Sequence, residues 1–220
     1  GNVGNGDLYR SEPRSSAIAM DVNRGPLERA REHIAQYQMG DYIETRLSDG
    51  LHALRAGEGD SLLIAGMGGG LTIRILSEGE PLLSGFRELI LEPQSDIDRV
   101  RAWLLEHGFF LAQENFVEED GKYYPMMRAV KTEQDETWNR LNDQTIAVCD
   151  IYGPLLLRNG NPVLRRFLVR QHGQLTQILQ TLEAQKESEQ IIRRIAEVQE
   201  KLQQNESAYT ILGAIKSAGI

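Results

Sequence analysis

The chain has 220 residues, a formal net charge of −8, and apolar and charged fractions that are ordinary for a globular protein. No apolar run is long enough to span a membrane and no signal peptide precedes the first polar residues, so we expect a cytoplasmic protein. A single cysteine, Cys149, excludes an internal disulfide and a Cys-rich zinc site, the four histidines lack ligand spacing, and the negative charge argues against a globally basic nucleic-acid binder.

The first predicted elements form a strand–helix–strand unit. Residues 1–13 read as loop, residues 16–21 as a strand ending in Asp21, and Pro26 opens a helix that runs to about Met39. At the carboxyl end of a strand in an open α/β sheet, Asp21 is placed to accept hydrogen bonds from a ribose diol. An ordinary surface or capping aspartate is the alternative interpretation.

A second predicted strand, residues 42–47, alternates in polarity and is followed at once by Ser48-Asp49-Gly50. The Asp49 carboxylate and the neighbouring amides can read an adenine edge, with the carboxylate accepting from the amino group. The same residues can equally make a turn and a helix cap before Leu51.

The central feature of the chain is the apolar run of residues 61–65, which ends in four glycines within five residues. Residues 62–64 are predicted to be a buried parallel strand, and helical spacing resumes at residues 71–76. Glycine allows positive φ and close approach of a ligand, so Gly66 and Gly68–Gly70 predict a turn whose free amides face a ligand. A tight turn without any ligand is the alternative.

The next four predicted segments are a fourth strand, a helix and the two strands of a hairpin. Residues 88–92 read as a strand closed by Pro93, and residues 96–107 as an amphipathic helix that Gly108 terminates. Residues 109–117 and 123–130 flank an Asp-Gly turn and predict a β-hairpin. The sequence therefore predicts an α/β, doubly wound Rossmann-like sheet with an antiparallel edge hairpin. Such sheets bind ligands where their strands end, and Asp21, Asp49 and the glycine turn should converge there.

The composition changes after residue 130. Residues 131–138 read as a polar, acidic linker, and residues 141–157 contain a turn at Tyr152-Gly-Pro154. Two apolar stripes, residues 163–182 and 191–212, are separated by a polar segment and predict an antiparallel helical hairpin of coiled-coil type.

Four arginines cluster near the start of the first long helix. Arginine clusters suit phosphate contacts with structured RNA, whereas a solvated helix face accounts equally well for the charge. The candidate RNA-binding residues are Arg158, Arg165, Arg166 and Arg170.

Several segments together resemble the bacterial TrmK-type tRNA (adenine-22 N1)-methyltransferases. The resemblance covers almost the whole chain in order and spacing, and a strand followed by Ala-Gly-Met-Gly-Gly is its most specific part. The matching segments are residues 17–26 (AIAMDVNRGP), 46–51 (RLSDGL), 64–69 (IAGMGG), 89–93 (LILEP) and 119–123 (EDGKY).

The resemblance implies a class I methyltransferase fold that uses S-adenosyl-L-methionine to methylate N1 of adenine 22 in tRNA. It implies a cofactor-binding domain at residues 1–131 and a helical, tRNA-contacting domain at residues 132–220. Asp21 matches the ribose acid, and Ser48, Asp49 and Gly50 match the adenine-side loop. Ala65, Gly66, Met67, Gly68 and Gly69 match the segment beside the methyl donor and the target base.

The chain departs from the family at its beginning. The family starts with an apolar strand and a glycine-rich loop, whereas Val3-Gly4-Asn5-Gly6-Asp7 follows no strand and residues 8–14 are short and polar. We therefore expect the N-terminal part of the sheet to be incomplete and cofactor binding to be weak.

Two other functions stay open on the sequence. The first is a nicotinamide-dependent oxidoreductase, because Gly66-x-Gly68 follows a strand and an acid, Glu92, ends the next one. Its third glycine is replaced by Leu71. The second is a non-catalytic adaptor whose helical hairpin binds RNA or protein. The oligomeric state is not predicted.

Overall fold

The computed structural model describes residues 15–131 and 143–217, so the predictions for residues 1–13 and for most of the 131–138 linker lie outside the described residues. The chain divides into two compact units, each described by itself. Unit 1 comprises residues 1–60 and 74–86, and unit 2 comprises residues 61–73 and 87–220. The sequence-based boundary near residue 131 stays a prediction.

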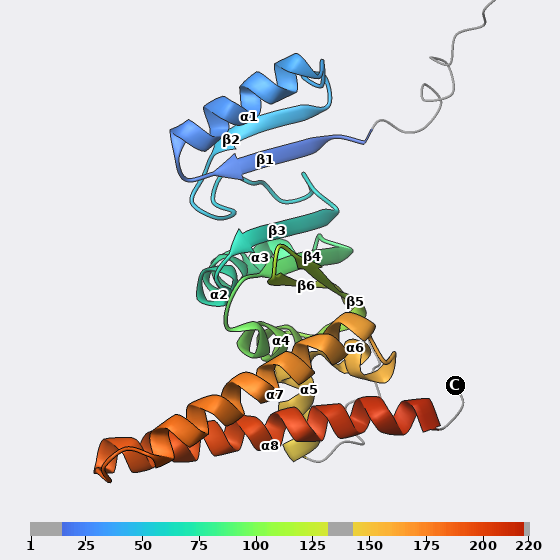
Figure 1. Cartoon of the computed structure of the whole chain (residues 1–220). Coiled ribbons are helices and arrows are strands. Elements are labelled where there is room, and N and C mark those ends of the chain that lie inside the picture. The colour runs from blue at the N-terminus through green and yellow to red at the C-terminus, as the bar shows by residue number, and fades with distance from the viewer. Residues whose placement is uncertain (1–14, 132–142, 218–220) are drawn as a thin grey trace, which may run out of the picture. The chain divides into compact units, whose positions relative to one another are not determined.

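Unit 1 contains a strand–helix–strand motif. Its two strands run parallel (Figure 1). Ala17 pairs with Ile43 and Asp21 with Leu47, and Leu27 of the connecting helix is buried. The helix starts two residues before Pro26, so this proline is the third helical residue rather than the first. The elements are β1 (Ala17–Asp21), α1 (Arg24–Gln36), β2 (Ile43–Leu47), the second half of α2 (Gly69–Glu78) and α3 (Glu80–Leu83).

Unit 2 is built on a four-stranded sheet of order β3-β4-β6-β5, in which β3 and β4 are parallel and the other pairs are antiparallel. The alternation of β4 buries Leu89 and Leu91 completely. The strands are β3 (Ser61–Met67), β4 (Glu88–Pro93), β5 (Phe109–Glu119) and β6 (Lys122–Lys131), and α4 (Ile97–Glu106) connects β4 to β5.

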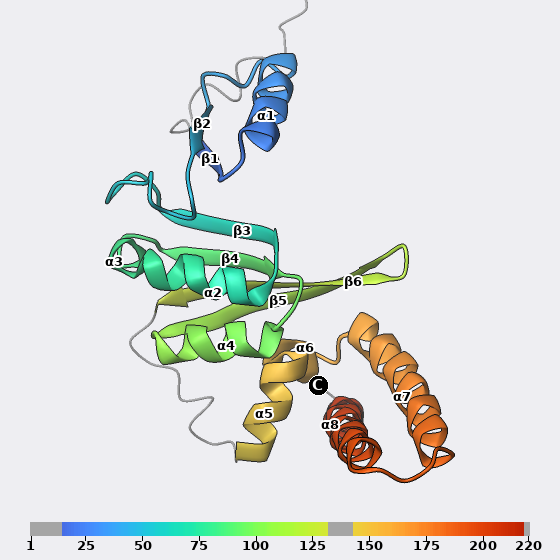
Figure 2. The ribbon, with the colours of Figure 1, turned by 90° about the vertical axis from the view of Figure 1, so that its left-hand side faces the viewer.

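The predicted hairpin is confirmed. Asp120 and Gly121 both have positive φ, 50° and 74°, which is the geometry of a two-residue turn that matches strand twist. Figure 2 shows the paired ends of β5 and β6 extending to this turn. The strands β1 and β2 pair in unit 1, and the other four described strands form the sheet of unit 2. That all of them make one continuous sheet stays a prediction.

The helical part of unit 2 packs on the hairpin. The long helices form the predicted antiparallel pair, whose seam is buried at Leu164, Leu168 and Leu212 but is about half exposed at Ile192 near the far end. Phe116 of β5 lies in the same core, and Phe167 packs edge-on against its ring. The helices are α5 (Asp143–Tyr152), α6 (Pro154–Arg158), α7 (Pro162–Glu183) and α8 (Glu189–Ser217).

A buried ion pair ties these helices to the sheet. Arg101 of α4 donates to Glu114 of β5 at 2.9 Å, and the two side chains are 3% and 0% exposed. Arg101 also donates to the main-chain oxygens of Asp150 and Ile151, while Glu114 accepts from the amide of Leu155. Both charges therefore have several partners, which offsets the loss of their hydration.

Candidate functional site

The carboxyl ends of β1 and β2 lie side by side in unit 1. Asp21 and Leu47 are the last residues of the parallel ladder, and the amide of Ser48 donates to the main-chain oxygen of Asp21 at 3.0 Å. Asp21 and the loop Ser48–Gly50 therefore meet at one edge, as the sequence predicts for two of the three strand ends.

Asp21 uses one carboxylate oxygen within its own turn. Its Oδ1 accepts from the amide of Asn23 at 2.7 Å, an Asx-type contact that fixes the side chain at the beginning of α1. The capping alternative is not realised, because the N-cap of α1 is Asn23 and no described side chain caps this helix. The contact uses Oδ1 only, and a carboxylate offers about four acceptor sites, so it leaves capacity for a second donor.

Ser48 shapes the loop through its hydroxyl group. The side chain is buried, its Oγ donates to the main-chain oxygen of Gly50 at 2.9 Å, and it accepts from the amide of Ala53 at 3.0 Å. Gly50 has a φ of 56°, and a Cβ there would lie 3.2 Å from Cγ1 of Ile75. Ser48 and Gly50 thus fix the backbone that carries Asp49.

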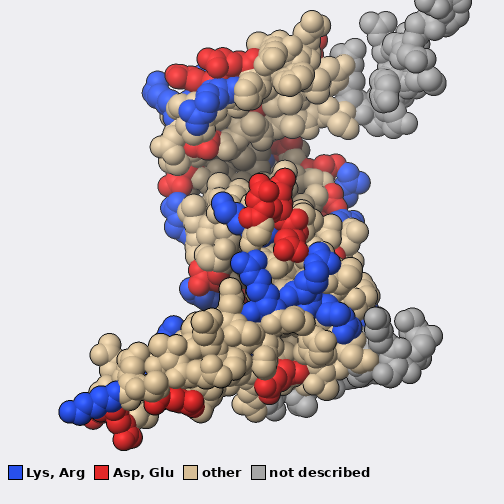
Figure 3. Space-filling model, in the orientation of Figure 1, with Lys and Arg blue, Asp and Glu red and all other residues tan. Residues whose placement is uncertain are grey.

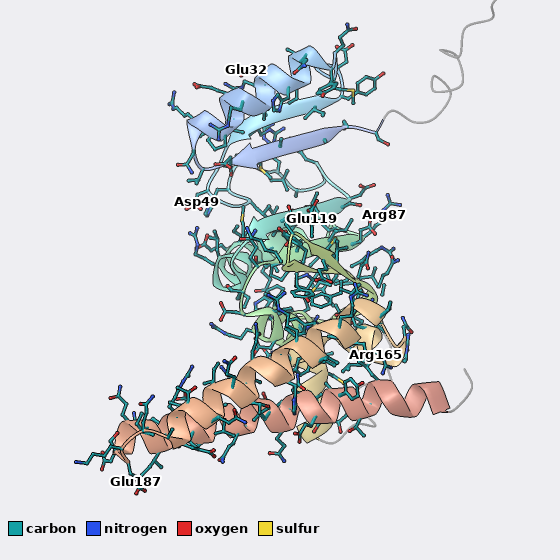
Figure 4. The ribbon with its side chains drawn as sticks, in the orientation of Figure 1. Glu32, Asp49, Arg87, Glu119, Arg165 and Glu187 are labelled. Atoms are coloured by element: carbon teal, nitrogen blue, oxygen red, sulfur yellow. The ribbon has the colours of Figure 1, made fainter. Side chains whose placement is uncertain are left out.

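Asp49 is paired with Arg74, a contact that the sequence did not predict. Nη2 and Nη1 of Arg74 lie 2.8 and 3.3 Å from the two carboxylate oxygens, and Arg74 also approaches Glu78 at 3.5 Å. The hydrogen bond from Arg74 holds the pKa of Asp49 below its usual value. Asp49, labelled in Figure 4, is therefore an ionised acceptor that is half exposed. No sequence signal links the two residues, because they come from a loop and a helix that are distant in the chain.

The glycine segment in unit 2 differs from its predicted form. The strand β3 continues to Met67, so Gly66 and Met67 belong to the strand and not to a turn. The ladder is irregular between Ala65 and Met67, and Gly66 there has a φ of 74°. The amide of Gly66 donates to Oε2 of Glu92 at 2.9 Å. Gly66 is therefore a bulge held by an acid of the neighbouring strand.

The expectation of free amides is also corrected at Gly69. Its amide donates to the main-chain oxygen of Ser95 at 3.0 Å, and a Cβ there would lie only 2.3 Å from the same oxygen. Gly68 accepts from Thr72 in the first turn of α2. Gly69 is required here for packing against the residues after β4, whereas a Cβ on Gly70 would meet nothing within 4 Å.

Three of the four candidate arginines make contacts within unit 2. Arg165, labelled in Figure 4, donates to the main-chain oxygen of Leu212 at 3.1 Å. It also stacks over Tyr209, with 5.5 Å to the ring centroid. Arg166 pairs with Glu118 at 3.2 Å. These contacts join α7 to α8 and to the hairpin.

The basic cluster at the start of α7 is partly neutralised. Arg170 donates to the main-chain oxygen of Gly121 at 3.4 Å, and Arg158 is exposed in the last turn of α6. On the face drawn in Figure 3, Lys and Arg side chains gather near the start of α7, next to acidic side chains of the hairpin. Contacts between these arginines and RNA stay a prediction.

Two expectations about the site also stay predictions. The glycine segment lies in the other unit from Asp21 and Asp49, so the convergence of all three strand ends is not tested. The expected weakness of cofactor binding depends on residues 1–14, which lie outside the described residues.

A family model described as tRNA (adenine(22)-N(1))-methyltransferase matches residues 7–207. The chain belongs to this family. Its similarity to the tRNA (adenine(22)-N(1))-methyltransferase of Bacillus subtilis strain 168 extends over 189 residues at 28% identity, which is 86% of this chain and 78% of that protein.

Solved structures of similar proteins have the same fold. An uncharacterised Listeria monocytogenes protein is 28% identical, with a TM-score of 0.79 over 88% of this chain and 82% of its own. The B. subtilis m1A22 tRNA methyltransferase is 25% identical, with a TM-score of 0.74 over the same shares. A Streptococcus pneumoniae protein solved with S-adenosyl-L-methionine is 28% identical, with a TM-score of 0.73 over 89% of this chain and 81% of its own.

These similarities confirm the predicted family and its Rossmann-like methyltransferase fold. As a member of the tRNA (adenine(22)-N(1))-methyltransferase family, the chain is a methyltransferase that uses S-adenosyl-L-methionine, which decides against the oxidoreductase and adaptor alternatives.

Within the described ranges, no helix is long and apolar enough to cross a membrane. The same residues contain no group of three or more His, Cys, Asp or Glu side chains that could hold a metal ion.

Proposed function

We propose that the chain transfers a methyl group from S-adenosyl-L-methionine to N1 of adenine 22 in tRNA, in the cytoplasm. The observation that carries the proposal is the family match over residues 7–207. The paired strand ends of unit 1 support it, because they place two carboxylates where an adenosyl group has hydroxyl and amino donors to offer.

The residues of unit 1 fit the adenosyl part of the methyl donor. Asp21 retains acceptor capacity for a ribose hydroxyl, and the ionised Asp49 can accept from the adenine amino group while it stays paired with Arg74. Ser48 and Gly50 would hold the loop that carries Asp49. When bound, the cofactor supplies a methyl group on a positively charged sulfur, which is an electrophile without further activation.

The residues of unit 2 are proposed to face the target base. N1 of neutral adenine attacks the methyl carbon with its lone pair, so a new N–C bond forms as the C–S bond breaks. No side chain has to remove a proton before the attack, and the cationic product can release a proton from its amine afterwards. Positioning by Ala65, Gly66, Met67, Gly68 and Gly69 then accounts for much of the rate.

The proposal is tested with the purified chain, a tRNA transcript and S-adenosyl-L-methionine labelled in its methyl group. We expect one methyl group per tRNA, recovered as N1-methyladenosine at position 22 by nuclease digestion and mass spectrometry. A transcript with guanine at position 22 is the matched control and should remain unmodified. Methylation at another adenine, or none when the cofactor binds, would contradict the proposal.

A further inference from the structure

Glu92 carries a buried carboxylate oxygen that no described residue satisfies. Glu92 lies opposite Ala65 in the β3–β4 ladder, and its Oε2 accepts from the amide of Gly66 at 2.9 Å. Its other oxygen, Oε1, is buried without a hydrogen-bond partner among the described residues. A buried acceptor without a donor is unfavourable, and more so when it is charged, so the site is suited to a donor from outside the chain.

Glu92 lies next to Ala65–Gly69, the segment that we propose to face the target base. The carboxylate is hydrogen-bonded to the bulge at Gly66. This glycine has a φ of 74° and carries no side chain that could cover the bulge. A Cβ on Gly66 would lie 3.9 Å from Nε2 of Gln94, so the exposed Gln94 side chain is the group nearest to this position. The main-chain amide of Gln94 donates to the main-chain oxygen of Met67. The hydrogen bond to Oε2 therefore fixes the orientation of the Glu92 carboxylate, and Oε1 lies beside the same bulge without a partner among the described residues.

We propose that Oε1 of Glu92 accepts a hydrogen bond from the exocyclic amine of the target adenine, an inference that rests on the proposed function. The amine is bonded to the ring carbon next to N1, so an acceptor at this place orients the edge of the base that is methylated. Donation to a carboxylate also increases electron density in the ring and makes N1 a better nucleophile. Glu92 therefore selects a 6-aminopurine.

The same contact excludes guanine. A guanine in this orientation presents a carbonyl oxygen where adenine presents its amine, and two acceptors facing each other repel. Discrimination of this kind is strong because the mismatched base leaves the buried Oε1 without a donor. The segment Ala65–Gly69 supplies no acidic side chain, so the acid comes from the adjacent strand.

The test combines a protein variant with a change in the base. Glu92→Gln keeps an oxygen for the amide of Gly66 but can present a donor where the wild type presents an acceptor. Glu88→Gln is the matched control, because Glu88 lies on the same strand and pairs with Ser61 and Arg128. Single-turnover rates are measured with tRNA that carries either adenine or purine riboside, which lacks the amine, at the target position.

We expect Glu92→Gln to lower the rate on adenine by about 10- to 100-fold, the range expected for a hydrogen bond to a charged group. The preference for adenine over purine riboside should fall by the same factor, while cofactor affinity measured by calorimetry stays unchanged. Glu88→Gln should keep the wild-type preference. If Glu92→Gln lowers both rates equally, Glu92 only holds the bulge and the inference is overturned.

A comparison on the wild-type protein does not depend on how the variant folds. The wild type should prefer adenine to purine riboside by more than the difference in their N1 reactivity towards dimethyl sulfate. A preference equal to that difference overturns the inference and leaves the proposed function intact. A wild-type protein that methylates no tRNA overturns both.

Discussion

At the scale of single residues, three aspartates differ in what surrounds them. Asp21 is held by a backbone amide, Asp49 is ionised beside Arg74, and Asp150 lies half-buried in α5. Burial raises the pKa of Asp150 to about 6, while Arg101 opposes this rise and Asp98 adds to it. Asp49 is therefore suited to accept hydrogen bonds at neutral pH, whereas Asp150 is ionised there at the expense of stability.

Replacing Asp21 by Asn tests the proposed ribose contact. The amide keeps the size of the side chain but lacks the negative charge, so the affinity for S-adenosyl-L-methionine should fall by about 10-fold or more, as expected when a charge-assisted hydrogen bond is lost. Glu32→Gln on α1, a residue labelled in Figure 4, is the control for a loss of charge nearby. Equal affinities of the wild type and Asp21→Asn in calorimetric titration would remove Asp21 from the site.

The raised pKa of Asp150 predicts a dependence of stability on pH. Unfolded aspartate titrates near pH 3.9, so between about pH 4 and pH 6 the folded chain binds the proton more tightly and stability falls as pH rises. Asp150→Asn removes this loss, and we expect it to raise the free energy of unfolding at pH 7 by about 1–2 kcal/mol, discounted for partial exposure.

Urea unfolding of Asp150→Asn at pH 7 and near pH 3.5 measures this effect, which should vanish at the lower pH. Glu106→Gln, on the exposed end of α4, should change neither value. A variant that is no more stable than the wild type at pH 7 would show that solvent reaches the Asp150 carboxylate.

At the scale of elements, the two glycines that begin α2, Gly69 and Gly70, have different surroundings. A Cβ on Gly69 would lie 2.3 Å from the main-chain oxygen of Ser95, so Gly69→Ala should force the residues after β4 to move and destabilise the fold by about 1–3 kcal/mol. Gly70→Ala is the matched control, because its Cβ has open space and alanine favours a helix by up to about 1 kcal/mol.

Thermal unfolding of the two glycine variants distinguishes the two roles. The melting temperature should fall for Gly69→Ala and should stay equal or rise for Gly70→Ala. If the melting temperatures of both variants are higher than that of the wild type, the close approach of Ser95 does not require a glycine at the start of α2.

Local sequence patterns predicted the helices, strands and turns of this chain better than they predicted the contacts between distant residues. The strand at residues 88–92, the helix stop at Gly108 and the turn at Asp120-Gly121 depend on neighbouring residues, and all three are found in the structure. The partners of the glycine segment, Glu92 and Ser95, come from residues 26 positions later, and no spacing announces them.

The buried pair of Arg101 and Glu114 was not predicted for a related reason. Charged residues in an amphipathic helix and a strand normally face solvent, and only the docking of α5 and α6 buries these two.

At the scale of the whole molecule, a net charge of −8 must be reconciled with a polyanionic substrate. The basic cluster at the start of α7 is the surface that we predict to contact phosphates in spite of it. Arg165 is a poor probe of this cluster because it anchors α7 to Leu212. Arg158 and Arg166 are better probes because they are exposed.

Charge reversal at Arg158 and Arg166 should weaken tRNA binding and lower its dependence on salt. Each lost phosphate contact should reduce the slope of log affinity against log salt by about 0.7–0.9. Filter retention between about 50 and 200 mM salt measures the slope. Arg194→Glu on α8 is the control for a general change in charge, and an unchanged slope for the first two variants would exclude this surface.

The lone thiol, Cys149, gives the protein a built-in reporter. It lies in the core shared by α5, α7 and α8, and burial raises its pKa to about 11, so almost none of it is thiolate at neutral pH. A thiol-reactive dye should therefore label the chain only when this core opens, and no second cysteine contributes background. The labelling rate then measures how often the helices leave the sheet, and a bound tRNA that slows it must hold them in place.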